Sequence, residues 1–464
     1  MPEIIADNIS IVETNELERF SRIDAEYYHP KYLVLQKLYK KGNWSPIGCH
    51  LRTCEYGLSI AMNTEGKGYG ILRMDNLQGG FAFDDDLKYA PINEEVFDKY
   101  KLQKNDVLFN RVNSEEFVGR TGIYKLSGNH VFASYLVRCQ TKENELLPDY
   151  LNIFLNTEYG ILSIRRMSRR AVNQANVNAQ ELKAIKIPLP PLRFQEEIRN
   201  LLEKSHELFE KSKILYSQAE VLLLEELGLR DIDLFHEPSY AVNSADTITA
   251  NRIDAEYYQP KYERIIEAIK KHDHKEFWEI AFVDKTANPP YSKQKEIPII
   301  TQKHLGYYQI DEEFLFDPET EYTTAQFTKQ YSKYVLQKED ILLYSVGAYI
   351  GKANIFNLDV KAVSGSFLTI IRADKTIVDP YYLLGVLNSL VGATQSKRHS
   401  KATAQQYLYP ADIRKFIIPI LNKTIQEKIG QFIIDANSAR RQAKKLLEEA
   451  KKKVEEMIEN GQED

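Results

Sequence analysis

Asn288, Pro289, Pro290 and Tyr291 form the stretch whose residue types and spacing most directly suggest catalysis. An Asn side chain and a Pro carbonyl can accept hydrogen bonds from the amino group of a base that has left its stack, and a neighbouring Tyr can stack on that base. The simpler interpretation is a proline-rich turn before the apolar run that begins at Ile297. A catalytic site would require a second element that binds the donor of the transferred group.

The same four residues resemble the motif with which adenine N6 methyltransferases hold their target amino group. Those enzymes also need a glycine-rich turn between a strand and a helix to bind S-adenosylmethionine. The nearest candidate, SVGAYIG at 345–351, lacks the required spacing, and the first half of the chain has no counterpart of NPPY. An adenine N6 methyltransferase or a fused restriction enzyme that uses NPPY therefore stays an alternative function.

Other signatures of catalysis and metal binding are missing from the sequence. There is no GxxxxGK[ST] loop, no HExxH motif and no nucleophile elbow. Cys49, His50 and Cys54 lie close together, but a structural zinc site needs four well-spaced ligands and no second pair is found. We therefore expect no catalytic residue and no metal site, and a role in binding or scaffolding.

Basic and amide side chains that can contact DNA recur at matching places in the two halves of the chain. The segments are SIRRMSRRAVNQANVN at 163–178 and SKRHSKATAQQYLYP at 396–410. Lys and Arg contact backbone phosphates, and Asn and Gln amides reach base edges. The candidates are Arg165, Arg166, Arg169, Arg170, Asn173 and Gln174 in the first segment, and Lys397, Arg398, Lys401 and Gln405 in the second.

The aligned halves also differ where two readers of different DNA sequences would differ. ILRMDNLQGG at 71–80 aligns with IITQKHLGYY at 299–308, and FNRVNSEEFVGR at 109–120 is two residues longer than LYSVGAYIGK at 343–352. Neutral drift of a surface would produce the same pattern. The further candidate DNA contacts are Arg73, Asn76, Arg111 and Arg120 in the first half, and Thr301, Lys303 and Lys352 in the second.

These segments belong to a tandem duplication. The other repeated blocks are RIDAEYYHPKY (22–32) with RIDAEYYQPKY (252–262), YKLQKNDVLF (100–109) with YVLQKEDILL (334–343), and IPLPPLRFQEEI (187–198) with IPILNKTIQEKI (418–429). Their order is the same in both halves, which indicates two copies of one module. In the RIDAEYY blocks we interpret the paired tyrosines as an aromatic anchor, with the Arg and the Asp forming a local ion pair.

Each module is expected to be an α+β globe followed by a long helix. Short apolar runs such as DVLFNRV and GSFLTIIR alternate with turn residues and predict strands. After the Pro-containing boundaries, heptads predict two helices that pair antiparallel as a coiled coil and join two pseudo-symmetric globular domains. The expected domains are 1–187 (first globe), 188–230 (central helix), 231–418 (second globe) and 419–464 (distal helix).

The heptads name the residues that should pair the helices. In the first helix Leu202, Phe209, Tyr216 and Leu223 widen the apolar stripe beside the predicted seam. The predicted seam residues are Ile198, Leu201, Leu208, Leu215 and Leu222 in the first helix, and Ile429, Phe432, Ala439 and Leu446 in the second.

Composition limits the class of protein. The 464 residues are 43% hydrophobic and 27% charged, as in globular proteins, and no apolar run approaches the roughly 20 residues of a membrane span. The first residues do not form a secretory signal, and three cysteines cannot build a disulfide framework, so a cytoplasmic location is expected. A net charge of −5 argues against bulk attraction to nucleic acid and leaves local basic patches open.

In its repeated RIDAEYY segments, its LQKNDVLF and LQKEDILL blocks, its two boundaries and the helices after them, the chain resembles the specificity subunit of Type I restriction-modification systems. The resemblance implies two target recognition domains, each reading one half of a split DNA site, and a helical pair that sets their spacing. It implies double-stranded DNA and two methyltransferase subunits as partners, with restriction subunits joining them. S-adenosylmethionine, ATP and magnesium are then expected on the partners, with no cofactor in this chain. A scaffold that does not touch DNA is a second alternative.

Overall fold

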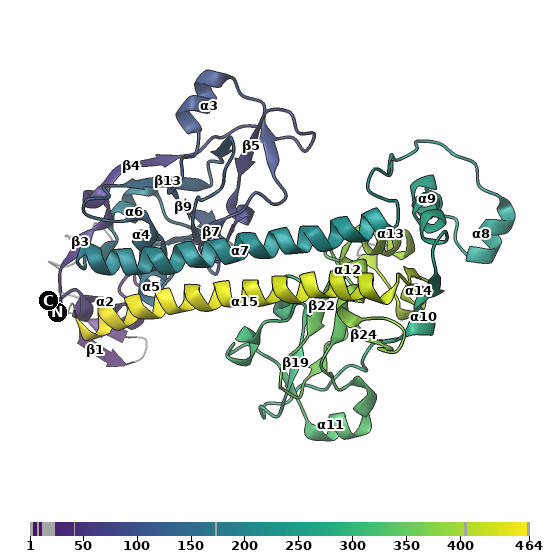
Figure 1. The fold of residues 1–464 in the computed structure, drawn as a ribbon. Helices are drawn as coiled ribbons and strands as arrows, with labels where there is room; N and C mark the ends of the chain where they lie inside the picture. The colour runs from purple at the N-terminus through teal and green to yellow at the C-terminus, as the bar shows by residue number, and fades with distance from the viewer. Residues whose placement is uncertain are drawn as a thin grey trace. The chain divides into compact units, whose positions relative to one another are not determined.

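The computed structural model describes residues 3–6, 9–11, 24–40, 42–171, 174–402 and 406–461. These residues form two compact units, one from Met1–Phe209 together with Arg441–Asp464 and the other from Glu210–Arg440. Each unit combines sheets with helices, so the expected α+β class is confirmed (Figure 1). Within the described chain, no helix is both long enough and apolar enough to cross a lipid bilayer.

The first unit is built on a sheet in the order β4-β13-β9-β11-β7-β6 and a second sheet in the order β12-β5-β8. The strands of these sheets are β4 (Leu51–Tyr56), β13 (Leu136–Thr141), β9 (Val107–Asn110), β11 (Thr121–Ile123), β7 (Phe81–Ala82), β6 (Leu77–Gln78), β12 (His130–Phe132), β5 (Tyr69–Leu72) and β8 (Lys88–Ala90). Its smaller sheets contain β1 (Glu3–Ala6), β2 (Ile9–Ile11), β3 (Trp44–Pro46), β10 (Val112–Asn113), β14 (Arg169–Ala171), β15 (Gln174–Asn176) and β16 (Lys186–Pro188). Its short helices include α2 (Leu33–Leu38), α3 (Glu94–Tyr100), α4 (Pro148–Leu155), α5 (Glu158–Met167) and α6 (Ala179–Ala184).

The second unit repeats this plan with a sheet in the order β18-β24-β21-β22, which corresponds to β4-β13-β9-β11. Its strands are β17 (His274–Glu276), β18 (Ala281–Asp284), β19 (Ile297–Ile300), β20 (Tyr322–Thr323), β21 (Asp340–Tyr344), β22 (Ala353–Phe356), β23 (Val363–Ser364), β24 (Leu368–Ala373), β25 (Lys401–Ala402), β26 (Gln406–Tyr407) and β27 (Ile417–Pro419). Its short helices include α8 (Ser244–Ala250), α9 (Pro260–Ile269), α10 (Phe277–Ile280), α11 (Ala325–Gln330), α12 (Pro380–Asn388), α13 (Leu390–His399) and α14 (Pro410–Ile413).

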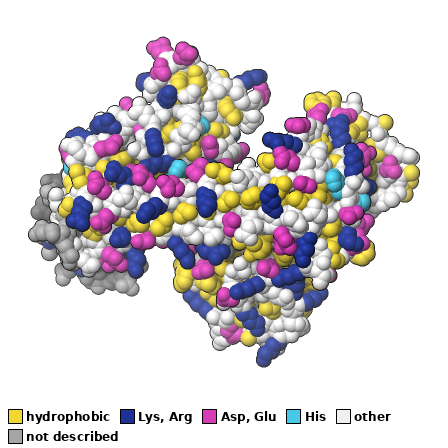
Figure 2. All heavy atoms as spheres, in the orientation of Figure 1, with side chains coloured by type: hydrophobic (Ala, Val, Ile, Leu, Met, Phe, Trp, Pro, Cys, Tyr) yellow, Lys and Arg dark blue, Asp and Glu magenta, His cyan; other side chains and the backbone are white. Residues whose placement is uncertain are grey.

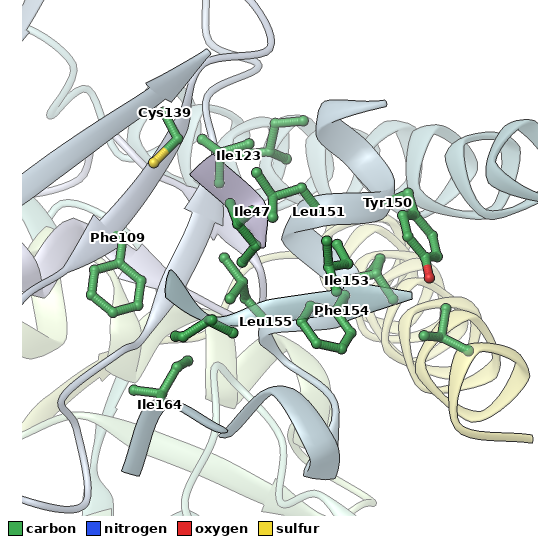
Figure 3. Close-up of a cluster of buried hydrophobic side chains, with 14 of the residues drawn as sticks. Ile47, Phe109, Ile123, Cys139, Tyr150, Leu151, Ile153, Phe154, Leu155 and Ile164 are labelled. Atoms are coloured by element: carbon green, nitrogen blue, oxygen red, sulfur yellow. The ribbon is translucent and has the colours of Figure 1, made fainter. Parts of the chain in front are cut away.

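A buried helix lies at the centre of each unit's core. In the first unit this is α4, whose Tyr150, Leu151, Ile153 and Phe154 side chains are buried among residues of the sheet such as Phe109 (Figure 3). All residues of α4 are buried, including the polar Asp149 and Asn152, so the helix is covered by protein on all faces. The equivalent helix α12 has the same role in the second unit.

The two long helices are α7 (Leu192–Glu226) and α15 (Lys423–Asn460), teal and yellow in Figure 1. Both compact units include part of each helix, whereas the sequence-based boundaries assign the helices to domains of their own. In the first unit the Ser205 hydroxyl donates a hydrogen bond of 2.8 Å to the Ala443 carbonyl. In the second unit the Tyr216 hydroxyl donates to the Asn437 side chain. Small or polar residues thus bring the paired backbones together, as expected of a close helical seam.

The buried line of the helical pair runs beside the predicted one. Ile198, Ile429 and Ala439 are buried, but the other predicted seam residues, Leu201, Leu208, Leu215, Leu222, Phe432 and Leu446, are only half-buried. The fully covered positions lie one residue further along: Leu202, Phe209, Tyr216 and Leu223 in α7, and Ile433 and Leu447 in α15. Of the half-buried residues, Leu201, Leu208, Leu215, Leu222 and Phe432 pack against the cores of the two units.

A repeated joint ties each globe to its long helix. The Tyr150 hydroxyl donates to the Pro188 carbonyl at 3.0 Å, and the Tyr382 hydroxyl donates to the Pro419 carbonyl at 2.9 Å. This contact holds the buried helix to the last strand before the long helix. The boundary blocks repeat in the sequence because each copy needs the same joint.

A buried glutamine completes the joint in both copies. The Gln195 side chain accepts a hydrogen bond of 2.8 Å from the Leu147 N–H and donates one of 3.0 Å to the Pro190 carbonyl. Gln426 accepts one of 3.0 Å from the Asp379 N–H in the same way. Each glutamine therefore links the first turn of the long helix to the start of the buried helix.

Candidate nucleic-acid interface

The repeated RIDAEYY segments dock against α5 and α13, the helices in which the basic segments begin. Tyr27 and Tyr28 meet edge to face with ring centres 4.9 Å apart, and Tyr257 and Tyr258 do the same at 4.9 Å. In the second copy Arg252 Nε and Asp254 Oδ2 form the expected ion pair at 2.7 Å, while Arg22 lies outside the described residues. The tyrosines therefore act as the anchor that the sequence predicts.

Two predicted DNA contacts belong to this anchor instead. The Arg166 guanidinium lies over the Tyr27 ring, and its Nε donates a hydrogen bond of 3.2 Å to the Tyr27 carbonyl. Arg398 lies over the Tyr257 ring and donates to Glu263 at 3.1 Å. Arg166 is buried and only 17% of the Arg398 side chain is exposed, so the structure gives both residues a role inside the fold.

Their sequence neighbours are exposed. Arg165 and Lys397 stand on the surface of the last turns of α5 and α13, and Arg169 and Lys401 follow in the strands after those helices. Arg169 Nε lies 2.6 Å from Glu181, and the ammonium groups of Lys397 and Lys401 lie 3.7 and 3.5 Å from Glu256 and Asp412. Arg165 has no ion-pair partner among the residues that the structure describes. The Lys397–Glu256 pair is exposed on both sides and therefore weak. Glu181 and Asp412 are only 12% exposed, but the side chains of Arg169 and Lys401 are 67% and 50% exposed and can reach a phosphate.

The amide candidates of these segments are only partly described. Gln174 is exposed at the start of β15. Asn173 and Gln405 lie outside the described residues, and for Arg170 the structure gives the backbone in β14 without a described side chain. Among the predicted amides of these segments, Gln174 is the one that the structure describes, and it lies at the surface.

Each unit has a short turn directly after a strand, which is β5 in the first unit and β19 in the second. The sequences of these two turns differ between the modules. Asn76 accepts a hydrogen bond from the Arg73 N–H at 2.9 Å and donates one of 2.8 Å to the Asp85 carbonyl. His304 accepts one of 3.1 Å from the Thr301 N–H. Asn76 is 3% exposed, so its amide closes this turn and is not available to a base, which corrects its assignment as a DNA contact. Thr301 and Arg73 are half-buried at the edge of the same turns.

The remaining predicted cations lie beside aromatic rings or carboxylates. Arg120 is exposed with its guanidinium 4.3 Å from the Phe117 ring centre, and Lys352 is exposed with its ammonium 5.1 Å from that of Tyr349. Lys303 Nζ lies 3.3 Å from Asp317 Oδ2. The structure thus keeps these three side chains at the surface.

Arg111 is fixed between two parts of the first unit. Its guanidinium lies 5.0 Å from the ring centre of Tyr56, and its Nε donates a hydrogen bond of 2.9 Å to the Ser134 carbonyl. These contacts hold it half-buried next to β15.

The NPPY residues line a hollow in the second unit. Asn288, Pro289 and Tyr291 face Thr301 and Phe367 across a space of about 600 Å³. Tyr291 is 74% exposed and Phe367 is 56% exposed, so aromatic rings stand at the rim of this hollow. The lining offers amide, hydroxyl and aromatic groups together with the charged side chains of Lys303 and Glu321, a mixture that can bind a flat, polar group.

Charge is mixed over the surface, as the small net charge predicts. On the face shown in Figure 2, Lys and Arg side chains are interspersed with Asp and Glu. Within the described ranges, no group of three or more His, Cys, Asp and Glu side chains is placed to hold a metal ion. Attraction to a polyanion would therefore depend on local groups of cations.

Comparisons with known proteins identify the family. The sequence model of the Type I restriction modification DNA specificity domain matches residues 60–217 and 275–451. The predicted MjaX specificity subunit of a type I restriction enzyme from Methanocaldococcus jannaschii is 25% identical over 420 residues, covering 89% of this chain and 91% of that protein. The type I restriction enzyme EcoKI specificity subunit of Escherichia coli is 29% identical over 180 residues, covering 38% of this chain and 37% of that protein.

A solved structure, of a Type I restriction-modification system S subunit from M. genitalium, is 14% identical and covers 91% of this chain and 96% of that chain, with a TM-score of 0.42. The family assignment therefore rests on the sequence matches and not on this structural similarity. Neither the methyltransferase nor the scaffold alternative gains support from any of these matches. Because the family model matches both modules and more than half of the sequence, the chain belongs to the Type I restriction modification DNA specificity domain family and is a Type I specificity subunit.

Proposed function

We propose that each module of this specificity subunit binds one half of a split, asymmetric site in double-stranded DNA. The observation that carries the proposal is the matched placement of exposed cations: Arg165 and Arg169 in the first unit correspond to Lys397 and Lys401 in the second. In each pair the first cation lies in the last turn of the equivalent helix, α5 or α13. The second cation lies in the strand that follows that helix, β14 or β25. Two modules with one frame and different exposed side chains would recognise different half-sites.

Phosphate and base contacts are assigned separately. We assign phosphate contacts to Arg165, Arg169, Lys397 and Lys401, since cations position a protein on the DNA backbone without reading sequence. We assign base contacts to Gln174 and Gln405, because amides pair with base edges in the major groove. Supporting contacts in the proposal are Arg73, Arg111, Arg120, Arg170, Asn173, Thr301, Lys303 and Lys352.

The catalytic steps are proposed to belong to partner proteins. Two methyltransferase subunits would dock on the long helices and carry S-adenosylmethionine, and restriction subunits would carry ATP and magnesium. This chain would then contribute no catalytic residue and no cofactor. The paired helices α7 and α15 would set the gap between the half-sites. Such a complex works where cellular DNA is, in the cytoplasm, and free thiols at Cys49, Cys54 and Cys139 are compatible with that location.

Mapping of methylated adenines tests the proposal. The chain is co-expressed with its methyltransferase subunit, and methylated adenines are located across the host genome by single-molecule sequencing. The expected result is a two-part motif with a fixed gap, and exchange of residues 252–417 for those of another family member should alter one half of the motif only. Methylation without a two-part motif, or a change in both halves after the exchange, would contradict the proposal. The chain expressed alone is the control and should not methylate DNA.

A further inference from the structure

Both units contain the same tight turn with an exposed aromatic residue. In the first unit the Leu136 N–H donates to the Ala133 carbonyl at 2.9 Å, and in the second the Leu368 N–H donates to the Gly365 carbonyl at 3.2 Å. These bonds close four-residue turns just before the central strands β13 and β24. The third residue of each turn is aromatic: Tyr135 is 50% exposed and Phe367 is 56% exposed.

Backbone hydrogen bonds hold each aromatic residue next to the basic segment of its own unit. The Arg111 N–H donates to the Tyr135 carbonyl at 3.0 Å, and the Val177 N–H donates to the Arg111 carbonyl at 2.9 Å. Val177 directly follows β15, the strand that begins at the exposed Gln174. In the first unit, the main chain of Arg111 therefore links the aromatic turn directly to the proposed DNA-contacting segment.

The second unit has the same connection. The Ser345 N–H donates to the Phe367 carbonyl at 3.1 Å, and the Leu408 N–H donates to the Ser345 carbonyl at 2.9 Å. Leu408 directly follows β26, which pairs with the strand that contains Lys401. The same positions in two diverged copies thus connect the turn with the exposed ring, through main-chain hydrogen bonds, to the basic segment.

The surroundings of the two rings suit a flat, partly polar ligand. Beside the turn of Tyr135, the Arg111 guanidinium covers the Tyr56 ring, which is 43% exposed. Phe367 borders the hollow of about 600 Å³ that Asn288 and Tyr291 also line. Aromatic faces next to amide and cationic groups are the combination with which proteins bind unstacked bases.

Keeping an aromatic ring in water at this position does not help the fold. Burial of a large apolar side chain stabilises a protein, and a ring that is half-exposed gives up part of that stabilisation. The turn requires only the backbone of its third residue. The hydrogen bond that closes the turn and the hydrogen bond that the carbonyl of the third residue accepts both use main-chain groups. The ring is therefore free to serve a ligand.

We propose that Tyr135 and Phe367 insert against the face of a base, each in the half-site that its own unit binds, and open one base step there. Apolar side chains that enter a base step unstack it partially and bend the duplex. The hollow beside Phe367 provides space for the base displaced in the second half-site. This inference rests on the proposed DNA-reading function and adds a contact that distinguishes sites by how easily they unstack.

The experiment uses the complete complex of this chain with its methyltransferase subunits. Variants Tyr135→Ala and Phe367→Ala are compared for binding to the mapped DNA site over a range of salt concentrations. Each should weaken specific binding by about tenfold to a hundredfold, the range for loss of one base–aromatic stack. The slope of affinity against salt should not change, because no phosphate contact is lost. Tyr135→Phe and Phe367→Tyr should keep wild-type affinity.

Phe316→Ala is the matched control, since this ring is 84% exposed and does not line the hollow beside Phe367. A second readout places 2-aminopurine at each position of the half-sites. Its fluorescence should rise on binding at one step per half-site and not rise in the matching Ala variant.

The outcomes separate the two ideas. A wild-type complex that binds all duplexes equally would overturn the proposed function itself. If the wild type prefers its site while both Ala variants bind like Phe316→Ala, or if no 2-aminopurine position responds, the function stands and base insertion is overturned.

Discussion

The guanidinium of Arg166 lies 4.4 Å from the centre of the Tyr27 ring, and Arg398 repeats this relationship with Tyr257 at 5.0 Å. In both units the arginine comes from the last turn of the helix in which the basic segment begins, and the tyrosine comes from the repeated RIDAEYY block. The block is therefore duplicated because each module fastens its leading segment in the same way. Neighbouring arginines in one helix consequently have different tasks.

Arg166→Ala should lower the free energy of unfolding by about 1–2 kcal/mol, because a buried cation–π contact and a hydrogen bond are lost together. Arg165→Ala, at an exposed position, should change it by less than about 0.5 kcal/mol. Urea denaturation of the purified chain measures both. Equal losses for the two variants would show that Arg166 does not hold Tyr27.

DNA binding should reverse the order of these two variants. Loss of the exposed Arg165 should reduce the slope of log affinity against log salt by about 0.9, the value for one phosphate contact. Arg166→Ala should keep the wild-type slope. Lys397 and Arg398 offer the same comparison in the second unit, and a reduced slope for the Arg166 and Arg398 variants would contradict it.

The joint glutamines should matter more than their neighbours. Gln195→Ala and Gln426→Ala should each lower the free energy of unfolding by about 1–3 kcal/mol, since the N–H groups of Leu147 and Asp379 lose their buried acceptors. Glu196→Ala and Glu427→Ala alter exposed residues on the same helical turns and serve as controls. Thermal or chemical denaturation measures the free energies of unfolding. Equal losses at the neighbouring positions would show that the hydrogen bonds of the two glutamines do not stabilise the joint.

The displaced helical seam predicts unequal effects at two adjacent leucines. Leu447→Ala should cost about 2–5 kcal/mol, because Leu447 is buried in the core of the first unit. Leu446→Ala should cost less than half of that, because Leu446 is half-buried at the side of the seam. A larger loss of stability in Leu446→Ala than in Leu447→Ala would show that the helices pair along the seam that the heptads predict.

Stability should fall as the pH drops below neutrality. Burial, together with the nearby cations Arg398, Lys415 and Arg252, lowers the pKa of His399 to about 3, and burial together with Lys303 lowers the pKa of His304 to about 4. The unfolded chain takes up these protons near pH 6.5 and the folded chain does not. Each group therefore costs up to about 1.4 kcal/mol of stability per pH unit from about pH 6.5 down to its folded pKa.

Unfolding by urea at pH 7 and pH 5 tests this dependence. His399→Gln should show a smaller loss between the two pH values than the wild type. His274→Gln replaces an exposed histidine and should behave as the wild type does. An unchanged pH dependence in His399→Gln would mean that His399 is not the group responsible.

Block order was enough to predict the architecture, since a tandem repeat with strands, boundaries and heptads leaves few alternatives. The sequence could not separate residues that differ only in helical phase. Leu201 and Leu202 are both apolar, and Arg165 and Arg166 are identical, so burial depends on which side of the helix meets the rest of the unit. Asn76 was misassigned for a related reason: a polar residue in a short turn looks exposed until its two main-chain partners are known.

The exposed aromatic pair was missed although a signal was present. Ser-Tyr-Leu at 134–136 aligns with Ser-Phe-Leu at 366–368, and an aromatic residue at the start of an apolar run suggests burial in a strand. Only the turn geometry shows that Tyr135 and Phe367 face solvent.

The division of each long helix between two cores bears on how the chain is made. The first unit needs Ala443, Leu447, Ala450, Val454 and Ile458, which are synthesised after every residue of the second unit, to complete its core. The module whose synthesis begins first therefore cannot complete its core until the second unit has been synthesised. A premature stop codon just after Arg440 would leave every residue of the second unit in place and remove part of the first unit's interior.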